Sequence, residues 1–92
     1  MQLVSKSSLK TWLRTERPVI LTNTALWPHL PAVENALHDG LFAVSDVNRP
    51  EFYEIEVGDN WYYIHIPSRI GGVYLIAAGK SSLELMSAVA AR

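Results

Sequence analysis

Residues 52–78 read FYEIEVGDNWYYIHIPSRIGGVYLIAA, and this stretch decides the fold. It holds three runs rich in β-branched and aromatic residues, at 52–57, 61–67 and 73–78. A Gly-Asp-Asn cluster separates the first two runs, and a cluster with paired glycines separates the last two. Runs of this length and composition are typical of strands, and such clusters are typical of turns. The stretch therefore predicts a three-stranded antiparallel meander.

The turn between the first two runs decides which side chains share a face of the sheet. A two-residue turn, either Gly58-Asp59 as type II′ or Asp59-Asn60 as type I′, produces the same two faces. One face then carries Tyr53, Ile55, Val57, Tyr62, Ile64 and Ile66. The other face carries Phe52, Glu54, Glu56, Trp61, Tyr63 and His65. A three-residue turn would mix the two sets, so the turn length tests this prediction.

Patterns on both sides of the meander predict three helices. The first ends near Arg17, because Pro18 disfavours the helical region for the residue before it. Its apolar stripe consists of Leu9, Trp12 and Leu13. A second helix is expected over about residues 31–39 and ends at Gly40. Its inward side chains are Val33, Ala36 and Leu37. A third, over about residues 82–92, follows a Ser81/Glu84 capping box, and we assign to its apolar face Leu83, Leu85, Met86 and Val89.

Two further short strands are expected at residues 19–22 and 41–45, where brief apolar runs are too short for helices. With the helix between them they would form a right-handed parallel crossover. The run at 73–78 has no polar residue on either face, which is typical of the centre of a sheet. The expected architecture is a single α+β domain over residues 1–92, an antiparallel meander of about three to five strands with about three helices packed on it.

Composition favours an ordered protein of the cytoplasm. The chain has 92 residues, of which 49% are hydrophobic and 18% charged, far from the composition of disordered segments. The absence of cysteine excludes disulfides, cysteine-ligated zinc and a thiol nucleophile. The first residues lack the pattern of a signal peptide, and no run of about 18 apolar residues could span a bilayer. We therefore expect a cytoplasmic location and no contact with membranes.

Charge is segregated along the chain although the formal net charge is −1. Residues 1–17 carry four cations against one carboxylate, and residues 18–59 carry seven carboxylates against one arginine. The cations of the first helix, at steps of four, four and three, are Lys6, Lys10, Arg14 and Arg17. This basic stripe is either a solvated face that pairs with the rest of the molecule, or a surface for phosphates or an acidic partner. The second reading makes nucleic-acid binding an alternative function.

The sequence contains no motif for a cofactor or a metal. Gly79-Lys80-Ser81 lacks the earlier glycine of a phosphate-binding loop, since that position is Tyr74. The histidines, at 29, 38 and 65, have no metal-binding spacing. Glu54 and Glu56 beside His65 could in principle support acid–base catalysis or ligand binding, but a flat hairpin face offers no cleft. We expect no cofactor, no metal and no enzymatic activity, and keep a small ligand-binding protein or enzyme as an alternative.

The face with Trp61 and Tyr63 remains the most informative feature. Aromatic side chains need a cover, which is either a helix of the same chain or another molecule. Aromatic clusters are also enriched at interface hot spots. The sequence therefore favours an interaction or regulatory module, such as an adaptor, inhibitor or subunit, that docks a protein and self-associates. The expected partner-binding residues are Phe52, Glu54, Glu56, Trp61, Tyr63 and His65.

Overall fold

The computed structural model describes residues 6–45, 49–67 and 72–91. Within them lies a five-stranded sheet of order β1-β5-β4-β3-β2, mostly antiparallel, with three α-helices packed on it, which confirms the predicted α+β class. The elements are α1 (Lys6–Glu16), β1 (Ile20–Leu21), the 3₁₀ helix η1 (Thr24–His29), α2 (Leu30–Asp39), β2 (Ala43–Ser45), β3 (Phe52–Val57), β4 (Asn60–His65), β5 (Val73–Gly79) and α3 (Ser82–Ala90).

The predicted meander and its hairpin register are confirmed. Val57 pairs with Asn60, so the β3–β4 turn is the two-residue Gly58-Asp59 turn. Gly58 has a φ of 59°, the positive value that a type II′ turn requires at its first central position. Strands β4 and β5 follow as antiparallel neighbours, with a β-bulge opposite Tyr63 and Ile64. The connection between these two strands, residues 68–71, lies outside the described residues.

The expected parallel pairing of the two short strands is wrong. β1 and β2 lie at opposite edges of the sheet, and β1 pairs in parallel with β5 through Ile20 and Leu21. β2 pairs with β3 in antiparallel fashion, which the short connection between them allows. Helix α2 therefore carries the chain across the whole sheet, and the central strand is β4 rather than β5.

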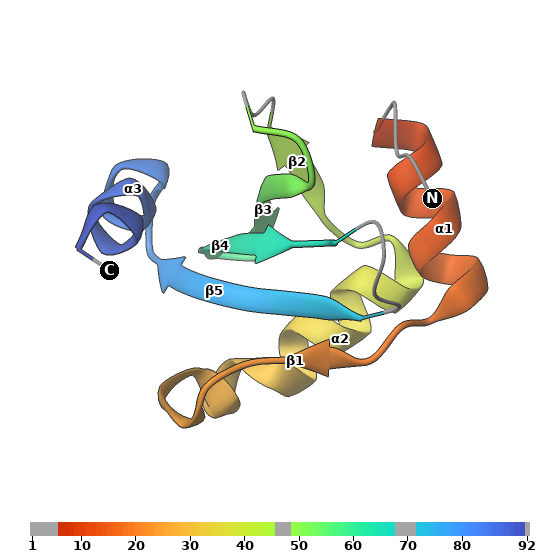
Figure 1. The fold of residues 1–92 in the computed structure, drawn as a ribbon, viewed down its shortest axis with the longest axis horizontal. Coiled ribbons are helices and arrows are strands. Elements are labelled where there is room, and N and C mark those ends of the chain that lie inside the picture. The colour runs from red at the N-terminus through yellow and green to blue at the C-terminus, as the bar shows by residue number, and fades with distance from the viewer. Residues whose placement is uncertain (1–5, 46–48, 68–71, 92) are drawn as a thin grey trace.

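One face of the sheet packs against α1 and α2 (Figure 1). The fully buried helix residues of this core are Leu9, Leu13, Val33 and Leu37. They meet the inward side chains of the central strands, Ile55, Tyr62, Ile64 and Leu75. The inward faces that periodicity predicted for the first two helices are confirmed, and Gly40 ends α2 with a φ of 74°.

Tyr62 places a hydroxyl group inside this core. The residue is 1% exposed, and its hydroxyl oxygen lies 2.8 Å from Nδ1 of His29. Burial raises the pKa of Tyr62 above its ordinary value of 10.0, against a hydrogen bond with Asn60 that lowers it. The folded state therefore favours the protonated phenol.

This raised pKa predicts a loss of stability in alkali. The neutral phenol contributes stability that is fully present below about pH 10, the unfolded pKa, and is lost as the pH rises through the higher folded pKa. We expect the urea midpoint of the wild type to fall between pH 9 and pH 11 by more than that of Tyr62→Phe. Equal falls in the two proteins would show that Tyr62 does not carry the effect.

Helix α3 covers the opposite face of the sheet and approaches it closely at Gly79. A Cβ atom at Gly79 would lie 2.6 Å from the backbone nitrogen of Leu85 and 3.0 Å from its Cα. Both of those atoms belong to backbone, so neither can move aside like a flexible side chain. The strand can therefore pass under the helix only because residue 79 has no side chain.

Gly79→Ala is expected to destabilise the fold by about 1–3 kcal/mol, because α3 must move away from β5. Gly72→Ala is the matched control, since a Cβ atom there would meet its nearest atom, the carbonyl oxygen of Val19, at an ordinary 3.5 Å. Urea unfolding of both variants measures the difference. A Gly79→Ala variant as stable as Gly72→Ala would contradict the close packing of α3.

Candidate functional site

The six residues predicted to bind a partner lie on one face of β3 and β4. They form three cross-strand pairs, Phe52 with His65, Glu54 with Tyr63, and Glu56 with Trp61. Helix α3 packs over the middle of this face. Glu54 and Tyr63 are buried, Glu56 is exposed, and the other three are half-buried. The chain's own last helix therefore covers part of the aromatic face.

Glu54 joins the sheet to the start of α3. Glu54 is 8% exposed, and its Oε1 accepts a hydrogen bond of 2.5 Å from the hydroxyl of Ser82. Ser82 is the first residue of α3, where the helix dipole also favours a carboxylate. The neighbouring Ser81 accepts a hydrogen bond of 3.1 Å from the backbone N–H of Glu84, as the capping box predicted. These contacts hold the amino-terminal end of α3 above β3.

Aromatic rings form a row at the other end of this face. The rings of Phe52 and His65 stack with their centroids 4.1 Å apart and their planes 3° apart. Tyr74 continues the row on β5, 6.3 Å from His65, and the guanidinium of Arg49 lies 4.2 Å from the centroid of Phe52. His65 Nε2 also lies 3.4 Å from a carboxylate oxygen of Glu51. His65 and Tyr74 lie beyond the apolar cluster under α3 and are half-buried, so part of this row faces solvent.

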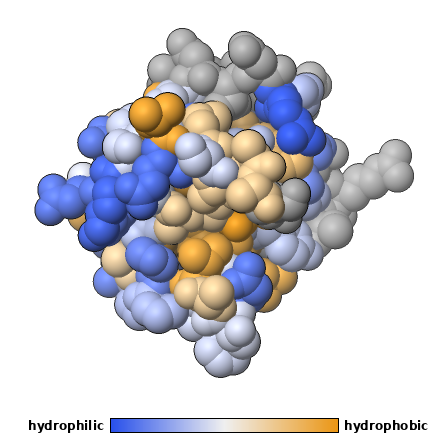
Figure 2. Space-filling model, turned by 90° about the vertical axis from the view of Figure 1, so that its left-hand side faces the viewer, coloured by the Kyte–Doolittle hydropathy of each residue, from blue (hydrophilic) through white to orange (hydrophobic). Residues whose placement is uncertain are grey.

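Helix α3 is apolar on two opposite sides. The side toward the sheet is formed by Leu85, Ala88 and Val89. The outward side carries an apolar stripe formed by Leu83, which is 79% exposed, Met86, which is 40% exposed, and the exposed Ala90. Positions 83, 86 and 90 recur at steps of three and four, so they share one side of the helix. Figure 2 faces the side of the molecule on which α3 lies and shows apolar surface in the middle of the view.

The inward assignment of Leu83 and Met86 is wrong. Successive helical residues are about 100° apart, so Leu83 and Leu85 point in nearly opposite directions and cannot both face the sheet. The packing selects Leu85, which is fully buried. A signal for the second apolar side was present in the sequence SLELMSAVA, in which apolar residues occupy two opposite sides of the helix and Glu84 is the one charged residue.

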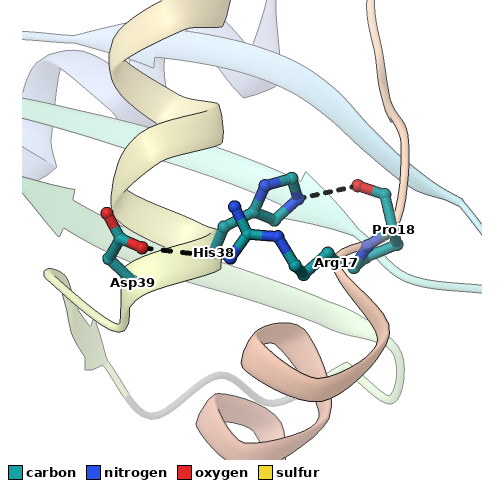
Figure 3. A network of polar contacts seen from close by, with 4 residues as sticks. All are labelled: Arg17, Pro18, His38 and Asp39. Atoms are coloured by element: carbon teal, nitrogen blue, oxygen red, sulfur yellow. Dashed lines mark hydrogen bonds and ion pairs between the residues drawn. The ribbon is translucent and has the colours of Figure 1, made fainter.

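Part of the predicted basic stripe contacts α2 within the same chain. Nζ of Lys10 lies 3.4 Å from the carbonyl oxygen of Gly40, at the end of α2 where the helix dipole favours a cation. A guanidinium nitrogen of Arg17 lies 4.0 Å from a carboxylate oxygen of Asp39 (Figure 3). Both side chains of that ion pair are more than half exposed, so it contributes little to stability. Arg14 is exposed, and the side chain of Lys6 lies outside the described part of the chain.

The histidines hold structural contacts. Nε2 of His38 donates a hydrogen bond of 3.0 Å to the carbonyl oxygen of Pro18, which ties α2 to the start of β1 (Figure 3). His29 contacts Tyr62, and His65 contacts Glu51. In the described ranges, no group of three or more histidine or acidic side chains could hold a metal ion.

A shallow depression lies where β1 ends beside β5. It measures about 290 Å³ and is lined by Leu21, Thr22, Asn23, Tyr74, Leu75 and Ile76. The hydroxyl of Thr22 is already engaged, since it donates a hydrogen bond of 2.8 Å to the carbonyl oxygen of Leu75. The carboxylates of Glu54 and Glu56 and the ring of His65 lie outside this lining.

Comparison of the chain with known proteins found no matching family model, no matching curated protein and no matching solved structure. Among the helices of residues 6–45, 49–67 and 72–91, none has the length and hydropathy needed to cross a membrane.

Ser82→Ala is expected to lower the free energy of unfolding by about 1–2 kcal/mol, because the buried carboxylate of Glu54 loses its donor. Urea unfolding at neutral pH measures the loss. Ser87→Ala, on the exposed side of the same helix, is the matched control and should change stability little. If Ser82→Ala costs as much after Glu54→Met, which removes the acceptor, as before it, the contact does not hold the helix.

Proposed function

We propose that this protein is a small interaction module, an adaptor, inhibitor or subunit, that docks a protein partner on the side of the sheet where α3 lies. The observation that carries the proposal is the outward apolar stripe of α3, formed by Leu83, Met86 and Ala90. Single exposed apolar side chains are common on monomers. A helix that is apolar on both sides is instead typical of one buried on both sides, and the chain covers one of them.

The aromatic row beside α3 supports the same surface. Phe52, His65 and Tyr74 are half-buried on the face of the sheet that α3 covers in part. Aromatic side chains supply large contact areas and are enriched at interface hot spots. Trp61 and Glu56, from the predicted partner-binding set, lie on this face as well. A partner seated on α3 could extend its contacts onto these rings.

The alternative functions have less support. Two cations of the basic stripe, Lys10 and Arg17, contact the end of α2, and Glu54 and Glu56 on the aromatic face would repel phosphates. Acid–base catalysis would need a cleft at His65, and the depression that the described residues form beside β1 does not include His65 in its lining. We therefore favour protein docking over nucleic-acid binding and over catalysis. The cysteine-free composition is consistent with the cytoplasmic location that this proposal includes.

The test is affinity capture from the native cell with the wild type and with the charge-neutral double variant Leu83→Lys and Met86→Glu. Both side chains are exposed, so the variant should fold, which thermal melting checks. We expect at least a tenfold loss of the captured protein, because charged groups would lose hydration in an apolar interface.

The matched control carries the same pair of charges on the exposed side of α2, as Ala32→Lys and Asn35→Glu, and should capture as much protein as the wild type. Equal capture by the α3 variant and the control would contradict the proposal. So would a wild type that captures no protein and stays monomeric at every concentration.

A further inference from the structure

The outward stripe of α3 has the spacing of a helix–helix contact. Leu83, Met86 and Ala90 recur at steps of three and four, the spacing of a coiled-coil seam, and the exposed Ser87 lies beside them. The stripe contains no charged residue. The large side chains of the stripe, Leu83 and Met86, lie toward the amino-terminal half of the helix, and the small side chains of Ala90 and the adjacent Ser87 lie toward the carboxyl-terminal half.

We propose that the partner seated on this stripe is a second copy of the chain, with the two α3 helices antiparallel. This inference rests on the proposed function and names its partner. In this arrangement a twofold axis passes close to Met86 and Ser87, so that Leu83 of each copy packs against Ala90 of the other. Large residues then meet small ones at both ends of the contact, as a self-complementary twofold interface requires. A parallel pair would instead place Leu83 against Leu83 and leave a gap between the two alanines.

The charges around α3 favour the antiparallel arrangement. Lys80 is exposed just before the helix, next to the positive end of its own dipole, and no basic residue lies in the last described turn. An antiparallel partner brings the negative carboxyl-terminal end of its α3 dipole toward Lys80, and Arg92, which follows that end in the sequence, lies outside the described residues. A parallel pair would bring the two Lys80 side chains and the like ends of the two dipoles together.

The size of the stripe sets the strength of the contact. A two-turn helix face is smaller than the roughly 800 Å² per partner that stable interfaces bury, so the dimer belongs to the weak and transient class. We expect self-association at concentrations of tens to hundreds of micromolar, on the order of the affinities of small interfaces.

Disulfide cross-linking can test the arrangement because the chain has no cysteine of its own. Leu83→Cys and Ala90→Cys are made as separate variants, one with a tag that changes its mass, and are mixed and oxidised at high concentration. The antiparallel pair predicts that the mixed dimer, which joins one copy of each variant, exceeds each homodimer at least fivefold, since positions 83 and 83 of the two copies lie far apart along the helices. Asn35→Cys on the exposed side of α2 is the control for random collision.

Light scattering measures self-association directly, as a change of mass, and needs no introduced cysteine. The wild type should move from 10.3 kDa toward twice that mass as concentration rises, and the Leu83→Lys, Met86→Glu variant should stay at the monomer mass. Excess of the Leu83→Cys homodimer would overturn the antiparallel arrangement. A monomeric wild type with cross-linking no faster than the Asn35→Cys control would overturn self-association. The proposed function would still stand in that case if the α3 variant lost a captured protein of a different kind.

Discussion

The register of the β3–β4 hairpin is the constraint on which the rest of the structure depends. The two-residue turn at Gly58 and Asp59 makes Val57 face Asn60. Every pair along the hairpin follows from it, since side chains alternate between the two faces of a strand. Ile55 and Tyr62 thereby enter the core under α1 and α2, and Tyr63 turns to the other face. A slip of one residue would exchange these two sets and expose the larger core.

The second face of the sheet receives less cover than the first, and the connection to α3 explains why. Two residues, Lys80 and Ser81, join β5 to α3, so the helix must begin directly at the end of the strand. Gly79 allows the close approach, and Leu85 fills the space against Tyr63 and Ala77. A nine-residue helix in this position covers part of the face and leaves its own outer side open to solvent.

Some of the charged side chains that are segregated along the chain make contacts within the molecule. Lys10 and Arg17 contact the end of α2, and Glu54 is held by Ser82 (Figure 3 shows the contact of Arg17). These contacts lie at helix ends, and that of Lys10 engages a backbone group, the carbonyl oxygen of Gly40 just past the end of α2. The outward stripe of α3 is left without charge, and this is what distinguishes it from an ordinary solvated helix face.

The amino-acid sequence by itself determined the meander, the two faces of its hairpin and the inward sides of the first two helices. These features are local, because strand alternation, turn type and helical periodicity depend on residues close together in the chain. Tertiary structure decided the partner strand of β1, the burial of Glu54 and Tyr63, and the side of α3 that meets the sheet. The pairing of β1 with β5 joins residues more than fifty positions apart, and no local pattern encodes it. Helix α3 is apolar on two opposite sides, so periodicity could not choose between them. The close approach of α3 to Gly79 decides which side of the helix meets the sheet. Leu85 packs there and is buried, whereas Leu83 and Met86 remain exposed.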